Sequence, residues 1–198
     1  MSAVVARPLV PVGGVGRRSL GWWGLATLIA TEAALFAYLL FAYYYILVQV
    51  GPSWFPEHAP SLKLALPNTV VLLVSSATVA WAEHSVRVGA RGRAVAGIVL
   101  TLLLGALFVA VQAFEWKAKP YTMQSGSYGS LYFTITGFHM AHVAAGLIVL
   151  MLVLIWTLAG YLDEKRNVPL LIASAYWHFV DIVWLAVFFT FYIVPRLW

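Results

Sequence analysis

Five apolar stretches run through the chain, and each is long enough to cross the hydrocarbon core of a bilayer. An α-helix rises about 1.5 Å per residue, so about 20 residues cross a core of about 30 Å. Charged residues make up only 10% of the chain and its mean hydropathy is +0.89, values that exclude an ordinary soluble domain. We therefore predict an all-α membrane protein built as a bundle of five transmembrane helices. The expected spans are Leu20–Val48, Leu66–Val86, Ala94–Trp116, Leu131–Gly160 and Leu170–Val194.

Little of the chain is left over for a domain outside the membrane. Residues 1–19 are rich in Gly, Pro and Val without a clear period, which predicts an irregular N-terminal tail. The first apolar stretch is too long for the core of a signal peptide, so we expect it to remain as a span. We thus expect two parts, the tail over residues 1–19 and a five-helix transmembrane domain over residues 20–198.

Basic residues are distributed unequally between the two sides that the five spans would create. Eight fall on the side of the N-terminus and four on the opposite side. Because Lys and Arg accumulate in cytoplasmic segments, the N-terminus is predicted to be cytoplasmic and the C-terminus outside. The net charge of +5 is therefore a signal of topology, and we expect no nucleic-acid partner. The eight are Arg7, Arg17, Arg18, Arg87, Arg91, Arg93, Lys165 and Arg166, and the four are Lys63, Lys117, Lys119 and Arg196.

An acidic residue, Glu32, lies near the middle of the first expected span, within the apolar sequence ATEAALFAYLLF. Charged groups at bilayer depth are costly, so such residues usually face the protein interior and have a partner or a task. Two interpretations stay open. Glu32 has a role with protons or lipid headgroups, or it is a neutral acid that is hydrogen-bonded to another helix.

The last expected span carries a histidine and an aspartate in the sequence AYWHFVDIVWLAVF. His178 and Asp181 are three residues apart and share a helix face, and Trp177 and Trp184 flank them at a spacing of seven. A carboxylate can orient an imidazole, so the pair is a candidate proton relay. The alternative is a buried pair that fixes helix packing.

Counting residues along the spans predicts two polar levels in the membrane. Glu32 and Asp181 each lie about 16 Å from the cytoplasmic end of their helix at about 1.5 Å per residue, so we expect Glu32 to lie with His178 and Asp181. A second level is expected nearer the outside. Its members are Gln112, Glu115, His139 and His142.

The sequence His139-Met140-Ala141-His142 places two imidazoles three residues apart on one helix. Histidines at this spacing can both bind a metal, and Glu115 and His178 would complete a carboxylate–histidine site. Neutral imidazoles also form hydrogen bonds between membrane helices, and this is the interpretation we favour, with no metal site. Five histidines and no cysteine leave too few ligands for an oxygen-reducing core, so we expect no redox cofactor in this chain.

Three sequence blocks, in this order, resemble subunit III of the haem-copper oxidases, most closely the cytochrome c oxidase type. The blocks are LPNTVVLLVSSATVAWAEHS at Leu66–Ser85, VQAFEWKAKPYTMQSGSYGSLYFTITGFHMAHVAAG at Val111–Gly146 and AYWHFVDIVWL at Ala175–Leu185. An acid in the first span, here Glu32, also fits the family. The resemblance runs from about Leu20 to the C-terminus.

The resemblance implies a non-catalytic subunit beside redox subunit I, which holds haem and copper. It implies further contacts with subunit II and a small subunit IV, bound phospholipid in a cleft, support of proton uptake by subunit I and protection from turnover inactivation. The five-helix form resembles subunits of bacterial oxidases and implies a bacterial plasma membrane. The positions that match the family's motifs are Glu32, Asn68, Trp81, His84, Glu115, His139, His142, Trp177, His178, Asp181 and Trp184.

Two departures from the family pattern stand out. Met140-Ala141 replaces the usual Gly-Leu between the paired histidines, although the spacing of the histidines is kept. Longer family members also have two more N-terminal helices, which form one wall of the lipid cleft and have no counterpart in this sequence.

Three alternatives stay open from the sequence. Within the family, the chain is the subunit III of a quinol oxidase or an accessory protein of a nitric oxide reductase. In another class, it is a free-standing transporter of protons or small solutes that uses Glu32 and the pair His178 and Asp181. In a third, it is a metal-dependent membrane enzyme that uses Glu115, His139 and His142.

Overall fold

The computed structural model describes residues 20–56 and 60–197, and its described part is built from helices. Five are long and apolar enough to cross a membrane, which confirms the predicted all-α bundle of five spans. The expected tail over residues 1–19 lies outside the described residues. The long helices are α1 (Leu20–Val50), α2 (Leu62–Arg87), α3 (Arg91–Lys117), α4 (Ser127–Leu158) and α5 (Val168–Phe188); the short ones are η2 (Pro52–Trp54), η3 (Phe189–Ile193) and α6 (Val194–Leu197).

Helix α2 begins earlier than its sequence suggests. Ser61 caps it by accepting a hydrogen bond from the Lys63 amide at 3.2 Å, and Pro67 lies inside the helix. The expected start at Leu66 is therefore about one turn late. Pro67 cannot donate a hydrogen bond to the Lys63 carbonyl and its ring crowds that carbonyl, so it weakens the first turns of α2 without ending the helix.

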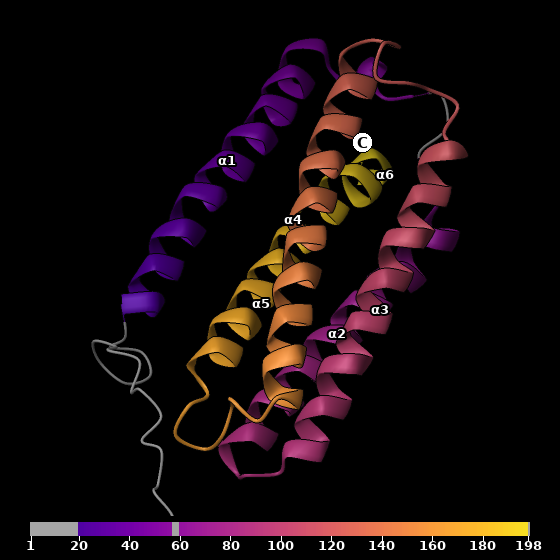
Figure 1. The fold of residues 1–198 in the computed structure, drawn as a ribbon. Coiled ribbons are helices and arrows are strands. Elements are labelled where there is room, and N and C mark those ends of the chain that lie inside the picture. Colours follow the sequence, from indigo (N-terminus) through magenta and orange to yellow (C-terminus); the bar gives the residue numbers. More distant parts are fainter. Residues whose placement is uncertain (1–19, 57–59, 198) are drawn as a thin grey trace, which may run out of the picture.

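Helices α2, α3, α4 and α5 form a ring in which each helix packs against its two neighbours. Helix α1 packs outside this ring, against α4 and α5, and Figure 1 shows it standing to one side of the bundle. The bundle has two ends, which we call the turn end (residues 88–90 and 159–167) and the loop end (residues 51–56, 60–61 and 118–126). The four-helix ring is thus the body of the protein, and α1 is an attachment to it.

The centre of the ring is organised around Trp177 of α5, whose side chain is fully buried. A Cβ atom on Gly105 of α3 or on Gly146 of α4 would come within 3 Å of its indole ring. Its Nε1 donates a hydrogen bond to Ser75 Oγ of α2 at 2.9 Å. Trp184, two turns further along α5, donates in the same way to Thr69 Oγ1 of α2 at 3.0 Å. The two indoles therefore hold three neighbouring helices against α5.

A π-helical turn, η3, interrupts the span that begins with α5. Within it Thr190, Phe191 and Tyr192 are consecutive and all buried. Thr190 faces α1, where its carbonyl accepts a hydrogen bond from Tyr43 at 3.1 Å and its hydroxyl contacts Tyr44 at 3.1 Å. Tyr192 instead contacts Glu115 of α3. The wider turn lets one short segment serve helices on two sides of it.

Candidate functional site

Glu32 of α1 and His142 of α4 form the only ion pair between α1 and the ring among the described residues. His142 Nε2 lies 2.9 Å from Glu32 Oε2, and the two side chains remain 15% and 26% exposed. The other ring nitrogen of His142 donates to the Phe138 carbonyl at 2.7 Å, and Phe36 packs edge-on against the imidazole. The pair therefore joins two helices at a position that stays accessible from the membrane side.

The hydrogen-bond pattern of this pair requires a hydrogen atom between the imidazole and the carboxyl group. Since the Phe138 carbonyl can only accept, His142 Nδ1 carries a hydrogen. The contact between Nε2 and Glu32 Oε2 then contains one further proton, on the imidazole or on the carboxyl group. Without it, two acceptors would face each other. The two arrangements differ only in which of the two groups carries that proton.

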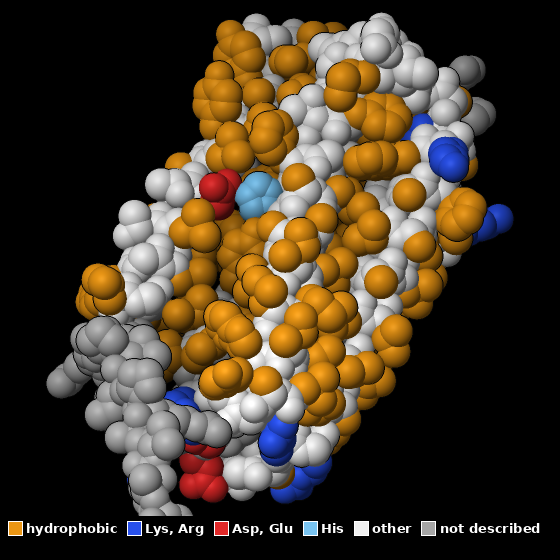
Figure 2. All heavy atoms as spheres, viewed as in Figure 1, with side chains coloured by type: hydrophobic (Ala, Val, Ile, Leu, Met, Phe, Trp, Pro, Cys, Tyr) orange, Lys and Arg blue, Asp and Glu red, His pale blue; other side chains and the backbone are white. Residues whose placement is uncertain are grey.

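Figure 2 shows an acidic and a histidine side chain side by side in a largely apolar face between α1 and α4. Towards the turn end, an apolar groove of about 290 Å³ lies between α4 and α5. The start of α1 borders it, because a Cβ atom on Gly21 would come within 3 Å of Ile172 in the groove wall. The groove is lined by Val149, Leu152, Val153, Trp156, Val168, Pro169 and Ile172.

The pairing of Glu32 with His142 corrects the predicted polar levels, which grouped Glu32 with His178 and Asp181. Counting residues gives the height of a side chain but not the helix that it faces, and α1 presents Glu32 to α4. Glu32 and His142 differ in height by about one helical turn when each is measured from the turn end of its own helix. Two long side chains and the tilt of the helices close that difference.

His178 and Asp181 of α5 meet at the same hydroxyl group, that of Ser76 in α2. Ser76 Oγ lies 2.7 Å from His178 Nδ1 and donates a short hydrogen bond to Asp181 Oδ2. Asp181 is 3% exposed, and its Oδ1 has no partner among the described residues. The two residues thus belong to one cluster, but a serine that the motif did not predict stands between them.

The two histidines of α4 have different neighbours. His139 is fully buried, donates from Nε2 to the Val180 carbonyl at 3.2 Å and lies against the Trp184 ring. His142 points to α1 instead. The proposed metal ligands Glu115, His139, His142 and His178 are therefore not brought together, and the described residues contain no group of three potential ligands. Their placement gives no support to the metal-enzyme alternative.

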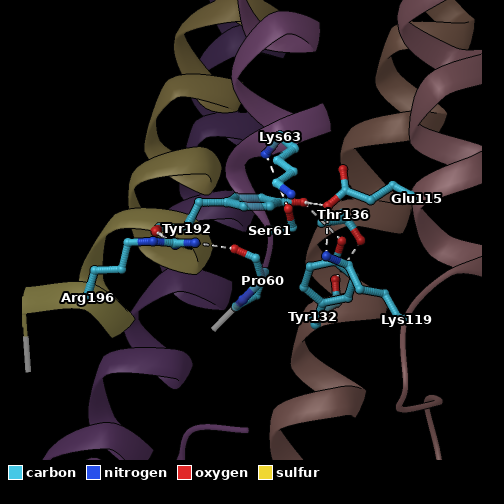
Figure 3. A network of polar contacts seen from close by, with 9 residues as sticks. All are labelled: Pro60, Ser61, Lys63, Glu115, Lys119, Tyr132, Thr136, Tyr192 and Arg196. Carbon is cyan, nitrogen blue, oxygen red and sulfur yellow. Dashed lines mark hydrogen bonds and ion pairs between the residues drawn. The ribbon is translucent and has the colours of Figure 1, made fainter. Parts of the chain in front are cut away.

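A buried network lies at the loop end of the ring (Figure 3). Glu115 of α3 binds the Lys119 ammonium at 2.7 Å and accepts a hydrogen bond from the Tyr192 hydroxyl at 2.6 Å. The ammonium group also lies about 5 Å from the ring centres of Tyr132 and Tyr192, within the range of a cation–π interaction. Beside it, Arg196 donates to the Pro60 carbonyl at 2.5 Å. Glu115 thus ties the end of α3 to Tyr192 of η3, and Lys119 adds a contact with Tyr132 of α4.

The remaining motif residues divide between the core and the surface. Asn68 is buried and donates to the Phe108 carbonyl at 3.2 Å, and Trp177 and Trp184 lie in the core. Trp81 is 41% exposed and His84 is also exposed. Of the residues missed by sequence reasoning, Lys119 had a signal, its spacing of four from Glu115. Ser76 and Tyr192 had none.

Two titratable groups outside the spans have pKa values shifted by their surroundings. Asp163, in the turn between α4 and α5, accepts hydrogen bonds from the Arg166 guanidinium at 2.6 and 2.9 Å. These bonds hold the pKa of that carboxyl group below its usual range. At the loop end, burial raises the pKa of Tyr121 above its usual range.

Five helices that are long and apolar enough to cross a membrane define a multi-pass integral membrane protein. The sequence model of the family described as cytochrome c oxidase subunit III matches residues 17–196. Proteins named cytochrome c oxidase subunit 3 are similar over 177 residues, which cover 86% of this chain and 68% of each relative. Those of Formosania lacustris and Petromyzon marinus are 36% identical and that of Drosophila melanogaster is 34% identical.

The chain belongs to the cytochrome c oxidase subunit III family. It is accordingly a membrane subunit of a respiratory oxidase complex, in a family that carries no redox centre of its own.

Proposed function

We propose that this chain is the non-catalytic third subunit of a bacterial aerobic oxidase, in the plasma membrane. It stabilises redox subunit I, binds phospholipid and supports proton uptake by that subunit, with haem and copper held by its partners. Membership of the family supports the place in the complex. Subunit I is the main partner, with subunit II and a small subunit IV as further ones.

The observation that carries the proton and lipid roles is the pair of Glu32 and His142. It lies at the joint between α1 and the ring, where α1 covers the other helices only in part. A proton shared by two groups that are both partly exposed can exchange with a neighbouring subunit or with water at its edge. The polar groups inside the ring are closed off from such exchange by packing.

The apolar groove between α4 and α5 supports the lipid role. Its lining consists of apolar side chains, apart from the indole nitrogen of Trp156, and it lies between the pair and the turn end of the bundle. An acyl chain fits this chemistry, with its headgroup at the turn end, where Arg91, Lys165 and Arg166 supply positive charge. The groove and the pair thus share the side of the protein that α1 borders.

The proton role is tested in the assembled oxidase in vesicles, with Glu32→Gln compared with Thr27→Val on the same helix. Among the described residues, the Thr27 hydroxyl bonds within its own helix, at the Trp23 carbonyl. We expect Glu32→Gln to slow proton uptake several-fold with the subunit still bound, and Thr27→Val to have no effect. Unchanged proton uptake by a Glu32→Gln complex that retains the subunit would refute this role.

The lipid role needs a separate measurement, the phospholipid retained per purified complex. Val149→Trp fills the groove, whereas Ile148→Trp alters the adjacent and more exposed position on α4. We expect Val149→Trp alone to lower the number of retained lipids. Equal retention in both variants would show that lipid does not occupy the groove.

Purification in mild detergent tests the place in the complex. Haem absorption bands and a large membrane partner are expected with the chain, and the haem type narrows the choice between a cytochrome c oxidase and a quinol oxidase. A colourless chain that purifies alone would favour the transporter alternative.

A further inference from the structure

A cavity of about 550 Å³ lies at the turn end of the bundle, between the turn that joins α2 to α3 and the turn that joins α4 to α5. Its volume is within the range of about 300–1,000 Å³ that small-molecule sites occupy. The cavity shares no lining residue with the groove between α4 and α5, so it is a separate feature. Its walls combine the apolar side chains of Val86 and Leu162 with the charged ones of Arg91, Glu164 and Lys165.

Two glycines with positive φ angles shape this turn-end cavity. Gly89 has a φ of 70° and Gly160 a φ of 78°, in the left-handed region that glycine adopts readily. The Glu164 carboxylate lies against the position that a Cβ atom on Gly89 would take. The Arg91 guanidinium lies 3.5 Å from the corresponding position at Gly160. Each glycine thus leaves room for a charged side chain from the opposite side of the cavity.

The charged groups around the cavity do not neutralise one another. The Arg91 guanidinium donates a short hydrogen bond to the Leu158 carbonyl, which fixes its position and leaves further N–H donors of the group available. The side chains of Glu164 and Lys165 form no hydrogen bond or ion pair within the described part of the chain. Opposite charges therefore surround one cavity without pairing. At this end of the bundle, Figure 2 shows basic and acidic side chains gathered together.

This charge pattern fits a ligand that carries both signs. A phosphate group is bound well by arginine and lysine, but alone it would be repelled by the Glu164 carboxylate. An amine alone would meet Arg91 and Lys165. Asp163 adds no free charge, because its carboxylate is bound by the Arg166 guanidinium. A ligand with a phosphate and a nearby amine satisfies all three unpaired groups.

We propose that the turn-end cavity binds an aminoalkyl phosphate group, with the phosphate at Arg91 and Lys165 and the ammonium at Glu164. The group is that of an ethanolamine phospholipid headgroup, and soluble phosphoethanolamine shares its chemistry. The cavity lies where α2 and α4 end and where α3 and α5 begin, at the end of the spans where headgroups rather than acyl chains are found. The inference deepens the proposed lipid role, on which it rests for the source of the ligand.

Lipid binding to the assembled oxidase, stripped of lipid in detergent, tests the chemistry of the site. Phosphatidylethanolamine, phosphatidylglycerol and phosphatidylcholine with the same short acyl chains are added, and bound lipid is counted by native mass spectrometry. Phosphatidylglycerol has no amine, and the quaternary ammonium of phosphatidylcholine has no N–H donor. We expect the ethanolamine lipid to bind several-fold more tightly than the other two. Equal affinity for the three lipids would overturn the proposal.

A charge-neutral substitution assigns this preference to the cavity. Glu164→Gln removes the carboxylate that faces the ammonium, and Glu83→Gln is the matched control, since Glu83 pairs with Arg87 and does not line the cavity. We expect Glu164→Gln to weaken binding of the ethanolamine lipid several-fold and not that of phosphatidylglycerol, with both unchanged in Glu83→Gln. Lys165→Gln should weaken both lipids, because both carry the phosphate. An unaltered preference in Glu164→Gln would overturn the proposal.

A soluble competitor distinguishes the two sources of the ligand. Phosphoethanolamine is titrated into the same lipid-free complex, with Glu164→Gln as the comparison. Binding that depends on Glu164 and is as tight as that of the short-chain lipid would support the site with a free compound as its ligand. Much weaker binding that still depends on Glu164 would support the site with phospholipid as its ligand. Binding that is equal in wild type and Glu164→Gln would overturn it.

The outcomes also separate this inference from the proposed function. If Glu164→Gln changes the headgroup preference while Val149→Trp retains all lipid, the cavity stands and the groove is refuted as a lipid site. The reverse result would refute the cavity alone.

Discussion

The polar groups of the ring of α2–α5 are buried, whereas those at the contact between α1 and the ring, Glu32 and His142, are partly exposed. In the ring, Trp177 and Trp184 bond to hydroxyl groups of α2 and are enclosed by packed helices. At the joint, Glu32 and His142 bond to each other and remain partly exposed. Similar hydrogen bonds therefore have different consequences. An enclosed bond specifies which helices pack together, whereas an accessible pair can also exchange a proton.

The largest effect should come from emptying the centre of the ring. Trp177→Ala removes an indole that fills the space between Gly105 and Gly146, and large-to-small core changes of this kind cost about 3–5 kcal/mol. Trp156→Ala on the same protein removes a 45% exposed indole and should cost under about 1 kcal/mol. Unfolding in SDS gives both free energies. Equal losses of unfolding free energy in the two variants would contradict the distinction between a packed centre and a lipid-facing surface.

The buried ion pair at the loop end should give the next largest effect. Lys119→Met leaves Glu115 buried without its cation, and breaking a buried ion pair in this way costs about 3–5 kcal/mol. Lys117→Met changes an exposed lysine two residues earlier and is the control. The free energy of unfolding of the double variant Glu115→Gln with Lys119→Met should recover much of the loss. If the double variant is no more stable than Lys119→Met, the unpaired charge of Glu115 is not the cause of the lost stability.

Removing a hydrogen bond between α1 and the last span should reduce stability less than either of these changes. Tyr44→Phe removes a hydroxyl contact to Thr190, and hydrogen bonds between membrane helices average about 0.6 kcal/mol. Tyr45→Phe, at an exposed neighbouring position, is the control. Hydrogen exchange should show faster opening of α1 in Tyr44→Phe while the ring is unchanged. Faster exchange throughout the ring would mean that α1 is an integral part of the bundle.

The smallest effect concerns the turn between α4 and α5. Because the pKa of Asp163 is lowered in the folded chain, its contribution to stability is present above the ordinary pKa of an aspartate. It is lost as the pH falls through the lowered value. The bonds are exposed and screened, so only the turn itself should loosen, seen as faster exchange of the Arg166 amide after correction for intrinsic rates. Asp163→Asn should abolish this pH dependence, and a dependence that survives would assign it to another group.

Hydropathy was sufficient to predict the five spans, because burial in a membrane leaves a long apolar signal in each segment. It could not identify partners across helices. Glu32 stands out from its apolar neighbours, but its pairing with His142 depends on how α1 is rotated and tilted against α4. Ser76 is one hydroxyl in a helix that has several, and only the fold places it between His178 and Asp181. The orientation in the membrane and the roles of these residues remain predictions.

Because of the π-helical turn at Phe189–Ile193, the structure of the last segment depends more on the number of residues in that turn than on their identity. Such a turn is one residue wider than an α-helical turn, so deleting one residue there would restore a regular helix. Everything beyond the deletion would then rotate by about 100°. Thr190 and Tyr192 could no longer face α1 and Glu115 together. A one-residue deletion in this turn is therefore expected to be far more harmful than most substitutions within it.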